Sequence, residues 1–132
     1  FSLFAADQFR KGTLIESTKD MVSRSREILK TNGINSVKSI CSSAEKFLAG
    51  TSVEKGSTII VDPPRPGLSK KVRECINNAE PEKIVYISCN PSTQARDLNF
   101  FVNKCKWDIE KFVIFDLYPN TNHMETGVVL VK

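Results

Sequence analysis

The chain has 132 residues, enough for one small domain with a hydrophobic core but not for two. A composition of 40% hydrophobic and 26% charged residues is ordinary for a globular protein, and no stretch of about 18 apolar residues occurs, which excludes a transmembrane helix. The formal net charge of +4 is compatible with a nucleic-acid partner but does not demand one.

Strand-like and helix-like segments alternate along the chain. We expect an apolar helical piece at 2–9, a strand at 13–16, a helix at 18–32, a strand at 37–41, a short helix at 43–48, a strand at 58–62, a helix at 69–78, a strand at 83–88, a helix at 92–104 and strands near 108–117 and 127–132. This order predicts a single α/β domain over residues 1–132 with a mostly parallel sheet. The last two strands have no helix between them, which predicts an antiparallel C-terminal pair.

The helix at 18–32 has clear start and stop signals. Thr18 can cap its first turn, and Asn32-Gly33 is a typical end. Its apolar residues are expected to face inward: Met21, Val22, Ile28 and Leu29.

The four cysteines show neither CxxC spacing nor an accompanying histidine cluster. We therefore expect no metal site, no disulfide framework and an intracellular, reducing compartment. Three of them are interpreted as small buried apolar residues: Cys41, Cys75 and Cys105.

Cys89 has a different setting, because it directly follows the apolar strand and precedes the turn Asn90-Pro91. The carboxyl end of a parallel strand borders the crevice where open α/β sheets bind ligands. Taken alone, Cys89 can be either a buried core residue or a functional thiol.

Two further motifs place polar groups at strand ends. In 59–68 (IIVDPPRPGL) an apolar strand runs into Asp62, two prolines and Arg65, and the prolines stiffen the turn. In 119–126 (PNTNHMET) the only histidine, His123, stands two residues before Glu125 and just before the last strand.

Together, DPPRPGL, YISCNPSTQARDL and the closing YPNTNHMETGVVLV resemble the S-adenosylmethionine-dependent RNA uracil-C5 methyltransferases, in the right order over almost the whole chain. The resemblance implies a class I methyltransferase, Rossmann-like fold. It also implies S-adenosylmethionine as cofactor and RNA as partner, with transfer RNA favoured over ribosomal RNA.

By the same resemblance, Cys89 is the nucleophile that adds to C6 of uracil and Glu125 is the general base. Asp62 is expected to contact the target base through N3 or O4, or to support the cofactor edge. His123 either orients Glu125, donates a hydrogen bond or has a structural role. Arg65 and Arg96 are expected either to bind RNA phosphate or to pair with Asp97 and other acids, and Arg65 is the one assigned to the substrate.

For the cofactor, Glu16 stands at the end of a strand, where the family's acid accepts from ribose hydroxyls. Ser43 departs from the family, which usually has an acid in the matching place near the adenine. No G-x-G pattern occurs and no initiator methionine is present, so we expect a truncated domain lacking the first strand and the Gly-rich loop.

Related methyltransferase families fit this sequence less well. RNA cytosine-C5 methyltransferases carry a second cysteine where this chain has Pro64 or Arg65, and adenine amino-methyltransferases carry an aromatic residue where it has Arg65, so both are disfavoured. The acid-free basic run Arg65, Lys70, Lys71 and Arg73 is either a phosphate-contacting rim or a solvated helix face. The departures at Ser43 and at the Gly loop leave a non-catalytic RNA-binding or RNA-folding module as the alternative function.

Overall fold

The computed structural model describes residues 2–51, 53–117, 119–121 and 123–132. The chain forms two compact units, Phe1–Gly50 and Thr51–Lys132, and each is described by itself. The single domain expected over residues 1–132 therefore stays a prediction. Within the described ranges, no helix is both long and apolar enough to cross a membrane.

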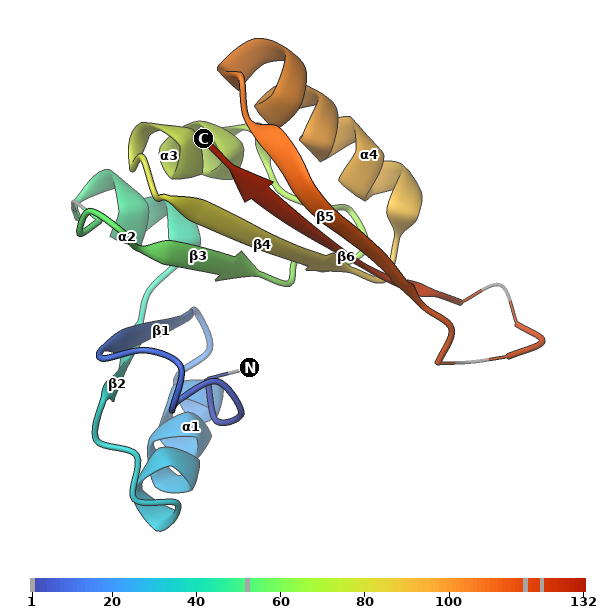
Figure 1. Cartoon of the computed structure of the whole chain (residues 1–132). Coiled ribbons are helices and arrows are strands. Elements are labelled where there is room, and N and C mark those ends of the chain that lie inside the picture. Colours follow the sequence, from blue (N-terminus) through green and yellow to red (C-terminus); the bar gives the residue numbers. More distant parts are fainter. Residues whose placement is uncertain (1, 52, 118, 122) are drawn as a thin grey trace. The chain divides into compact units, whose positions relative to one another are not determined.

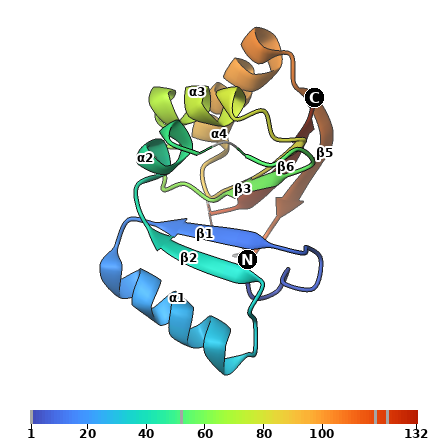
Figure 2. The ribbon, with the colours of Figure 1, turned by 90° about the vertical axis from the view of Figure 1, so that its left-hand side faces the viewer.

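The first unit contains two parallel strands and two helices, which are β1 (Gly12–Glu16), α1 (Lys19–Thr31), β2 (Val37–Cys41) and α2 (Ala44–Ala49) (Figure 2). The register runs from Gly12 opposite Val37 to Glu16 opposite Cys41, so the carboxyl ends of both strands finish level. Residues 2–7 form turns instead of the expected helical piece. The Gln8 N–H donates to the carbonyl oxygen of Ala5 at 2.9 Å, which is the i→i+3 hydrogen bond of a turn.

Helix α1 begins after Thr18 and is followed by its C-cap, Asn32, as predicted. The Thr18 side chain makes no capping hydrogen bond, so the cap expected from it is wrong, and the buried face of α1 is narrower than expected. Val22 and Leu29 are 2% and 6% exposed, whereas Met21 and Ile28 are about half exposed. Positions 22 and 29 are seven residues apart and share one stripe of a helix. The inward placement predicted for Met21 and Ile28 is therefore wrong.

The second unit contains one four-stranded sheet and its helices (Figure 1). Its elements are β3 (Thr58–Val61), α3 (Lys70–Asn78), β4 (Lys83–Ser88), α4 (Pro91–Asn99), the π-helical turn η1 (Phe100–Lys104), β5 (Asp108–Phe115) and β6 (Glu125–Val131). The strand order is β3-β4-β6-β5. Strands β3 and β4 are parallel, and β6 runs antiparallel to both of its neighbours. The predicted antiparallel C-terminal pair is confirmed, and β6 lies between β4 and β5.

Helices α3 and α4 cover one face of this sheet (Figure 1). Strand β4 alternates strictly, with Ile84, Tyr86 and Ser88 buried and the intervening residues half-buried, as expected when one face of a strand packs on helices. The side chains that are fully buried there include Ile76, Ile84, Tyr86, Phe101, Val128 and Leu130.

The cysteines outside the candidate site are less buried than expected. Cys41 is exposed, and Cys75 and Cys105 are only half-buried. Cys41 ends β2, where its Sγ lies 3.5 Å from the carbonyl oxygen of Ser17. The prediction of a buried role is therefore wrong for Cys41.

Candidate functional site

Cys89 and Glu125 occupy matching positions at one end of the β4–β6 ladder. The last pair of this antiparallel ladder is Ser88 opposite Thr126. Cys89, in the bend after β4, directly follows Ser88, and Glu125 directly precedes Thr126, so the two flank the last pair of the ladder. Two residues that are 36 positions apart in the sequence thus lie at the same end of the β4–β6 ladder, and both are half-buried.

Three buried polar side chains hold this end of the ladder. Thr126 Oγ1 lies 2.8 Å from Gln94 Oε1 and 3.2 Å from the carbonyl oxygen of Ser88. Gln94 Nε2 donates to the carbonyl oxygen of Tyr86 at 3.0 Å. All three polar residues are at most 2% exposed, so each hydrogen bond is protected from water. The sequence motifs did not indicate this role for Gln94 or Thr126. Their only signal in the sequence is a polar residue type at a position that faces the core.

Asp62 directly follows β3 and is exposed. Since Val61 pairs with Tyr86 in the parallel β3–β4 ladder, Asp62 reaches the same sheet edge as Cys89. The segment after it is attached to the start of α4, because the carbonyl oxygen of Arg65 accepts from Asn90 Nδ2 at 3.1 Å. Asp62 and Cys89 therefore each follow the carboxyl end of a strand of this parallel pair.

The side chain of Arg65 contacts His123, with 3.2 Å between Nη2 and Nδ1. A guanidinium can only donate, so Nδ1 accepts and a neutral His123 carries its proton on Nε2. The backbone N–H of His123 donates to Thr121 Oγ1 at 3.2 Å. The contact joins the segment after β3 to the segment before β6. Tyr118 and Asn122 of the closing motif lie outside the described residues.

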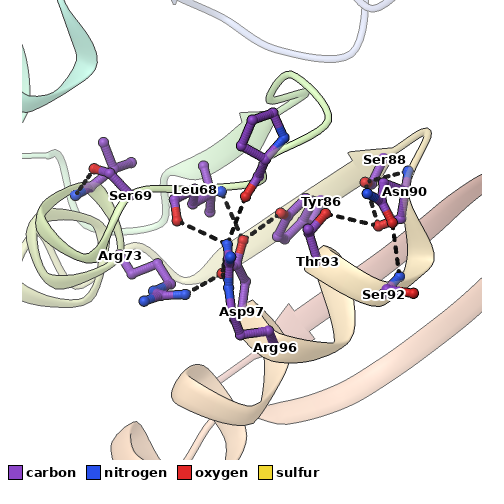
Figure 3. A network of polar contacts seen from close by, with 12 residues as sticks. Leu68, Ser69, Arg73, Tyr86, Ser88, Asn90, Ser92, Thr93, Arg96 and Asp97 are labelled. Atoms are coloured by element: carbon purple, nitrogen blue, oxygen red, sulfur yellow. Dashed lines mark hydrogen bonds and ion pairs between the residues drawn. The ribbon is translucent and has the colours of Figure 1, made fainter.

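Asp97 is a buried carboxylate at the centre of a polar network (Figure 3). Its Oδ2 accepts from the Leu68 N–H and from the Tyr86 hydroxyl, both at 2.8 Å. Its Oδ1 accepts from Arg96 Nε at 3.0 Å and from Arg73 Nη1. Burial and the hydrogen bond to Asp97 raise the pKa of Tyr86, which keeps its hydroxyl protonated as a donor. Of the alternatives for Arg96, the structure therefore shows pairing with Asp97.

The basic run after β3 is not a continuous rim. The side chain of Arg73 is only 14% exposed and is directed to Asp97. Lys70 is 80% exposed, and its Nζ lies 3.8 Å from Glu74 Oε1 on the next turn of α3. Lys71 is exposed as well. Arg73 is thus unsuited to the phosphate contact considered for it, whereas Lys70 and Lys71 remain on the surface.

In the first unit, Glu16 and Ser43 lie at the carboxyl edge of the β1–β2 sheet. The Thr18 backbone N–H donates to Glu16 Oε1 at 2.7 Å and lowers the pKa of Glu16, which keeps the carboxylate ionised. Ser43 is the N-cap of α2, since its Oγ accepts from the Lys46 N–H at 3.2 Å. An ionised carboxylate at a strand end can accept hydrogen bonds from both hydroxyls of a ribose. The Ser43 hydroxyl oxygen accepts from the helix backbone, which leaves the hydroxyl proton for donation to a ligand. The residues present therefore fit a nucleoside-type cofactor.

Comparison with known proteins identifies the family of the chain. A family model described as tRNA (uracil-5-)-methyltransferase matches residues 1–132. A tRNA/tmRNA (uracil-C(5))-methyltransferase of Campylobacter curvus is 36% identical over 146 aligned positions, covering all of this chain and 39% of that protein. A tRNA (uracil(54)-C(5))-methyltransferase of Pyrococcus horikoshii is 33% identical over 99% of this chain and 30% of its own length.

Among solved structures, the tRNA (uracil-54, C5)-methyltransferase of Pyrococcus abyssi, in complex with S-adenosyl-L-homocysteine, superposes with a TM-score of 0.82 at 30% identity. The match covers 99% of this chain and 31% of that one. The class I methyltransferase fold expected from the sequence is thereby confirmed. The chain spans about 27–39% of the length of the curated relatives that it matches.

Proposed function

Because the chain belongs to the tRNA (uracil-5-)-methyltransferase family, we propose that the protein carrying it methylates C5 of a uridine in RNA, with transfer RNA as the favoured substrate. The observation that carries the proposal is the end of the β4–β6 ladder, where Cys89 and Glu125 flank the Ser88–Thr126 pair. A thiol and a carboxylate are the two groups that this reaction requires. An RNA substrate also implies that the protein works inside the cell.

The C5 carbon of uracil is a poor nucleophile until a second group adds to the ring. Cys89 Sγ, as thiolate, bonds to C6, and the electron pair of the C5–C6 double bond moves through C4 to O4. The resulting enolate makes C5 nucleophilic. S-adenosylmethionine, when bound, supplies a methyl group on a positively charged sulfur. Glu125 then accepts the C5 proton, the C5–C6 double bond re-forms and the thiolate of Cys89 leaves.

Three further residues are proposed to hold the uracil and its RNA. Asp62 lies at the same sheet edge as Cys89, where its carboxylate can accept from N3–H of the ring. Arg65, in the segment after β3, contacts His123, which stands two residues before Glu125. A guanidinium and an imidazole beside the uracil ring can stabilise the negative charge that develops at O4, or can bind RNA phosphate. The target base must leave its stack to reach Cys89.

For the cofactor, we propose that Glu16 accepts from the ribose hydroxyls and that Ser43 lies near the adenine. The lowered pKa of Glu16 supports this role, because the acceptor stays ionised at neutral pH. Asp62 is proposed at the cofactor edge as well as at the base.

One observation favours the alternative, a non-catalytic RNA-binding or RNA-folding module. Ser43 stands where the family usually has an acid, and its hydroxyl oxygen already accepts from the α2 backbone. Such a module would bind RNA but would show no chemistry at Cys89.

A covalent trap separates the two functions. The full-length protein is mixed with transfer RNA containing 5-fluorouridine and with S-adenosylmethionine, and the product is measured by intact mass. Fluorine at C5 cannot leave as a proton does, so the Cys89 adduct is expected to accumulate. Cys89→Ala is expected to abolish the adduct, whereas Cys105→Ala, which removes another half-buried thiol, is expected to retain it.

A second arm uses ordinary transfer RNA and the variant Glu125→Gln. The nucleophile is intact but the C5 proton cannot be removed, so a methylated adduct is expected to accumulate where the wild-type protein turns over. RNA binding by the wild-type protein without any adduct would refute the proposed reaction and support the non-catalytic module.

A further inference from the structure

The segment that carries Asp62 and Arg65 is attached to one face of α4. We call residues 62–68 the β3–α3 loop. Its backbone is held by four side chains, which we call the loop clamp: Asn90, Thr93, Arg96 and Asp97. Figure 3 shows these four side chains and the contact of Asp97 with Leu68. Positions 90, 93 and 97 are three or four residues apart, so they share one face of a helix.

The first half of the clamp holds Arg65. Its carbonyl oxygen accepts from Asn90 Nδ2 at 3.1 Å and from Thr93 Oγ1 at 2.9 Å. Asn90 has a second contact, since its Oδ1 accepts from the Ser92 N–H at 3.2 Å and so caps α4. Both ends of the Asn90 amide are therefore used, one for the helix and one for the loop. Asn90 also directly follows Cys89 in the chain.

The second half of the clamp holds the end of the loop. Arg96 Nη2 donates to the carbonyl oxygen of Pro66 at 2.8 Å, and Asp97 Oδ2 accepts from the Leu68 N–H at 2.8 Å. Gly67, between them, has a φ of +78°, and a Cβ there would lie 2.6 Å from Asp97 Oδ2. The loop backbone thus approaches α4 as closely as a glycine permits.

We infer that the loop clamp is a positioning device that sets Asp62 and Arg65 relative to Cys89, with Asn90 as its positioning residue beside the reacting thiol. The inference rests on the proposed function. Prolines at positions 63, 64 and 66 leave few free dihedral angles in the loop. A hydrogen bond at the Arg65 carbonyl therefore also restricts Asp62, three residues earlier. Misplacing a substrate-positioning group by about 1 Å can cost about a hundredfold in rate.

Two substitutions separate positioning from helix capping. Asn90→Ser keeps an N-cap of similar strength but removes the donor to Arg65. Thr93→Val keeps the side-chain shape and removes the hydroxyl, while Thr93→Ser restores it. The matched control is Asn103→Ser, at a position beyond the other end of α4. It removes an exposed side-chain amide that donates a hydrogen bond to Asn99 Oδ1.

The measured quantity is the rate of adduct formation by the full-length protein with 5-fluorouridine transfer RNA. We expect about a ten- to hundredfold decrease in Asn90→Ser and Thr93→Val. The rate is expected to recover in Thr93→Ser and to be unchanged in Asn103→Ser. If Asn90 serves only as a cap, Asn90→Ser leaves the rate unchanged, and the inference is overturned.

A second readout does not depend on activity. Hydrogen–deuterium exchange, followed by mass spectrometry of peptides covering the β3–α3 loop, is expected to accelerate at Gly67 and Leu68 in Asn90→Ser and Thr93→Val, while β4 and β6 keep their protection. Unchanged exchange in the loop overturns the clamp even if no protein forms an adduct. Absence of an adduct in the wild-type protein overturns the proposed function instead, so the two failures are distinguishable.

Discussion

Replacing Gly67 by alanine is expected to separate the β3–α3 loop from α4. The added Cβ would lie 2.6 Å from Asp97 Oδ2, 2.8 Å from Arg96 Nη2 and 3.2 Å from Thr93 Cβ. The Arg96 side chain can move away, but Asp97 is short, fully buried and held by donors on both oxygens. The loop has to retreat, and the Leu68–Asp97 hydrogen bond is lost.

The cost has two parts. Alanine at a positive φ costs about 1–2 kcal/mol of backbone strain. Losing a hydrogen bond to a buried charged group costs about 1.5–3 kcal/mol more. We therefore expect Gly67→Ala to lower the free energy of unfolding by about 2.5–5 kcal/mol.

Gly56 offers a matched control in the same unit. Its φ is +81°, but a Cβ there would meet nothing nearer than Glu82 Oε2 at 3.5 Å, an ordinary contact. Gly56→Ala is thus expected to show the strain alone, about 1–2 kcal/mol. Urea unfolding of both variants, followed by tryptophan fluorescence, measures the difference. Equal losses in the two variants would refute the close approach of the loop to α4.

Two further predictions concern titration and the cofactor. The pKa of Tyr86 is raised in the folded protein. The contribution of Tyr86 to stability is therefore complete below the unfolded pKa of about 10. As the pH rises above that value, the contribution is lost by up to about 1.4 kcal/mol per pH unit. Urea titrations between pH 9 and 11.5 are expected to show a shallower decline in Tyr86→Phe, and identical slopes would contradict this. In the full-length protein, Glu16→Gln is expected to weaken binding of S-adenosyl-L-homocysteine about tenfold, measured by calorimetry, because the ionised acceptor is lost; unchanged affinity would exclude Glu16 from the ribose site.

The sequence by itself determined the local structure and the family. Strands and helices followed from apolar periodicity and capping residues, and the observed β2 and β4 match the predicted ranges 37–41 and 83–88. The motifs around Asp62, Cys89 and Glu125 identified the family because their order and residue types are specific. These signals depend on neighbours within a few residues, which a sequence displays directly.

Only the tertiary structure decided which of these residues meet. Cys89 and Glu125 flank the Ser88–Thr126 pair because β6 lies between β4 and β5, and strand order depends on packing of the whole unit. The same holds for the contact of Arg65 with His123, 58 positions away, and for the ion pair of Asp97 with Arg73, 24 positions away. A buried carboxylate and a surface one look alike in a sequence, because their difference is set by partners brought together from distant segments.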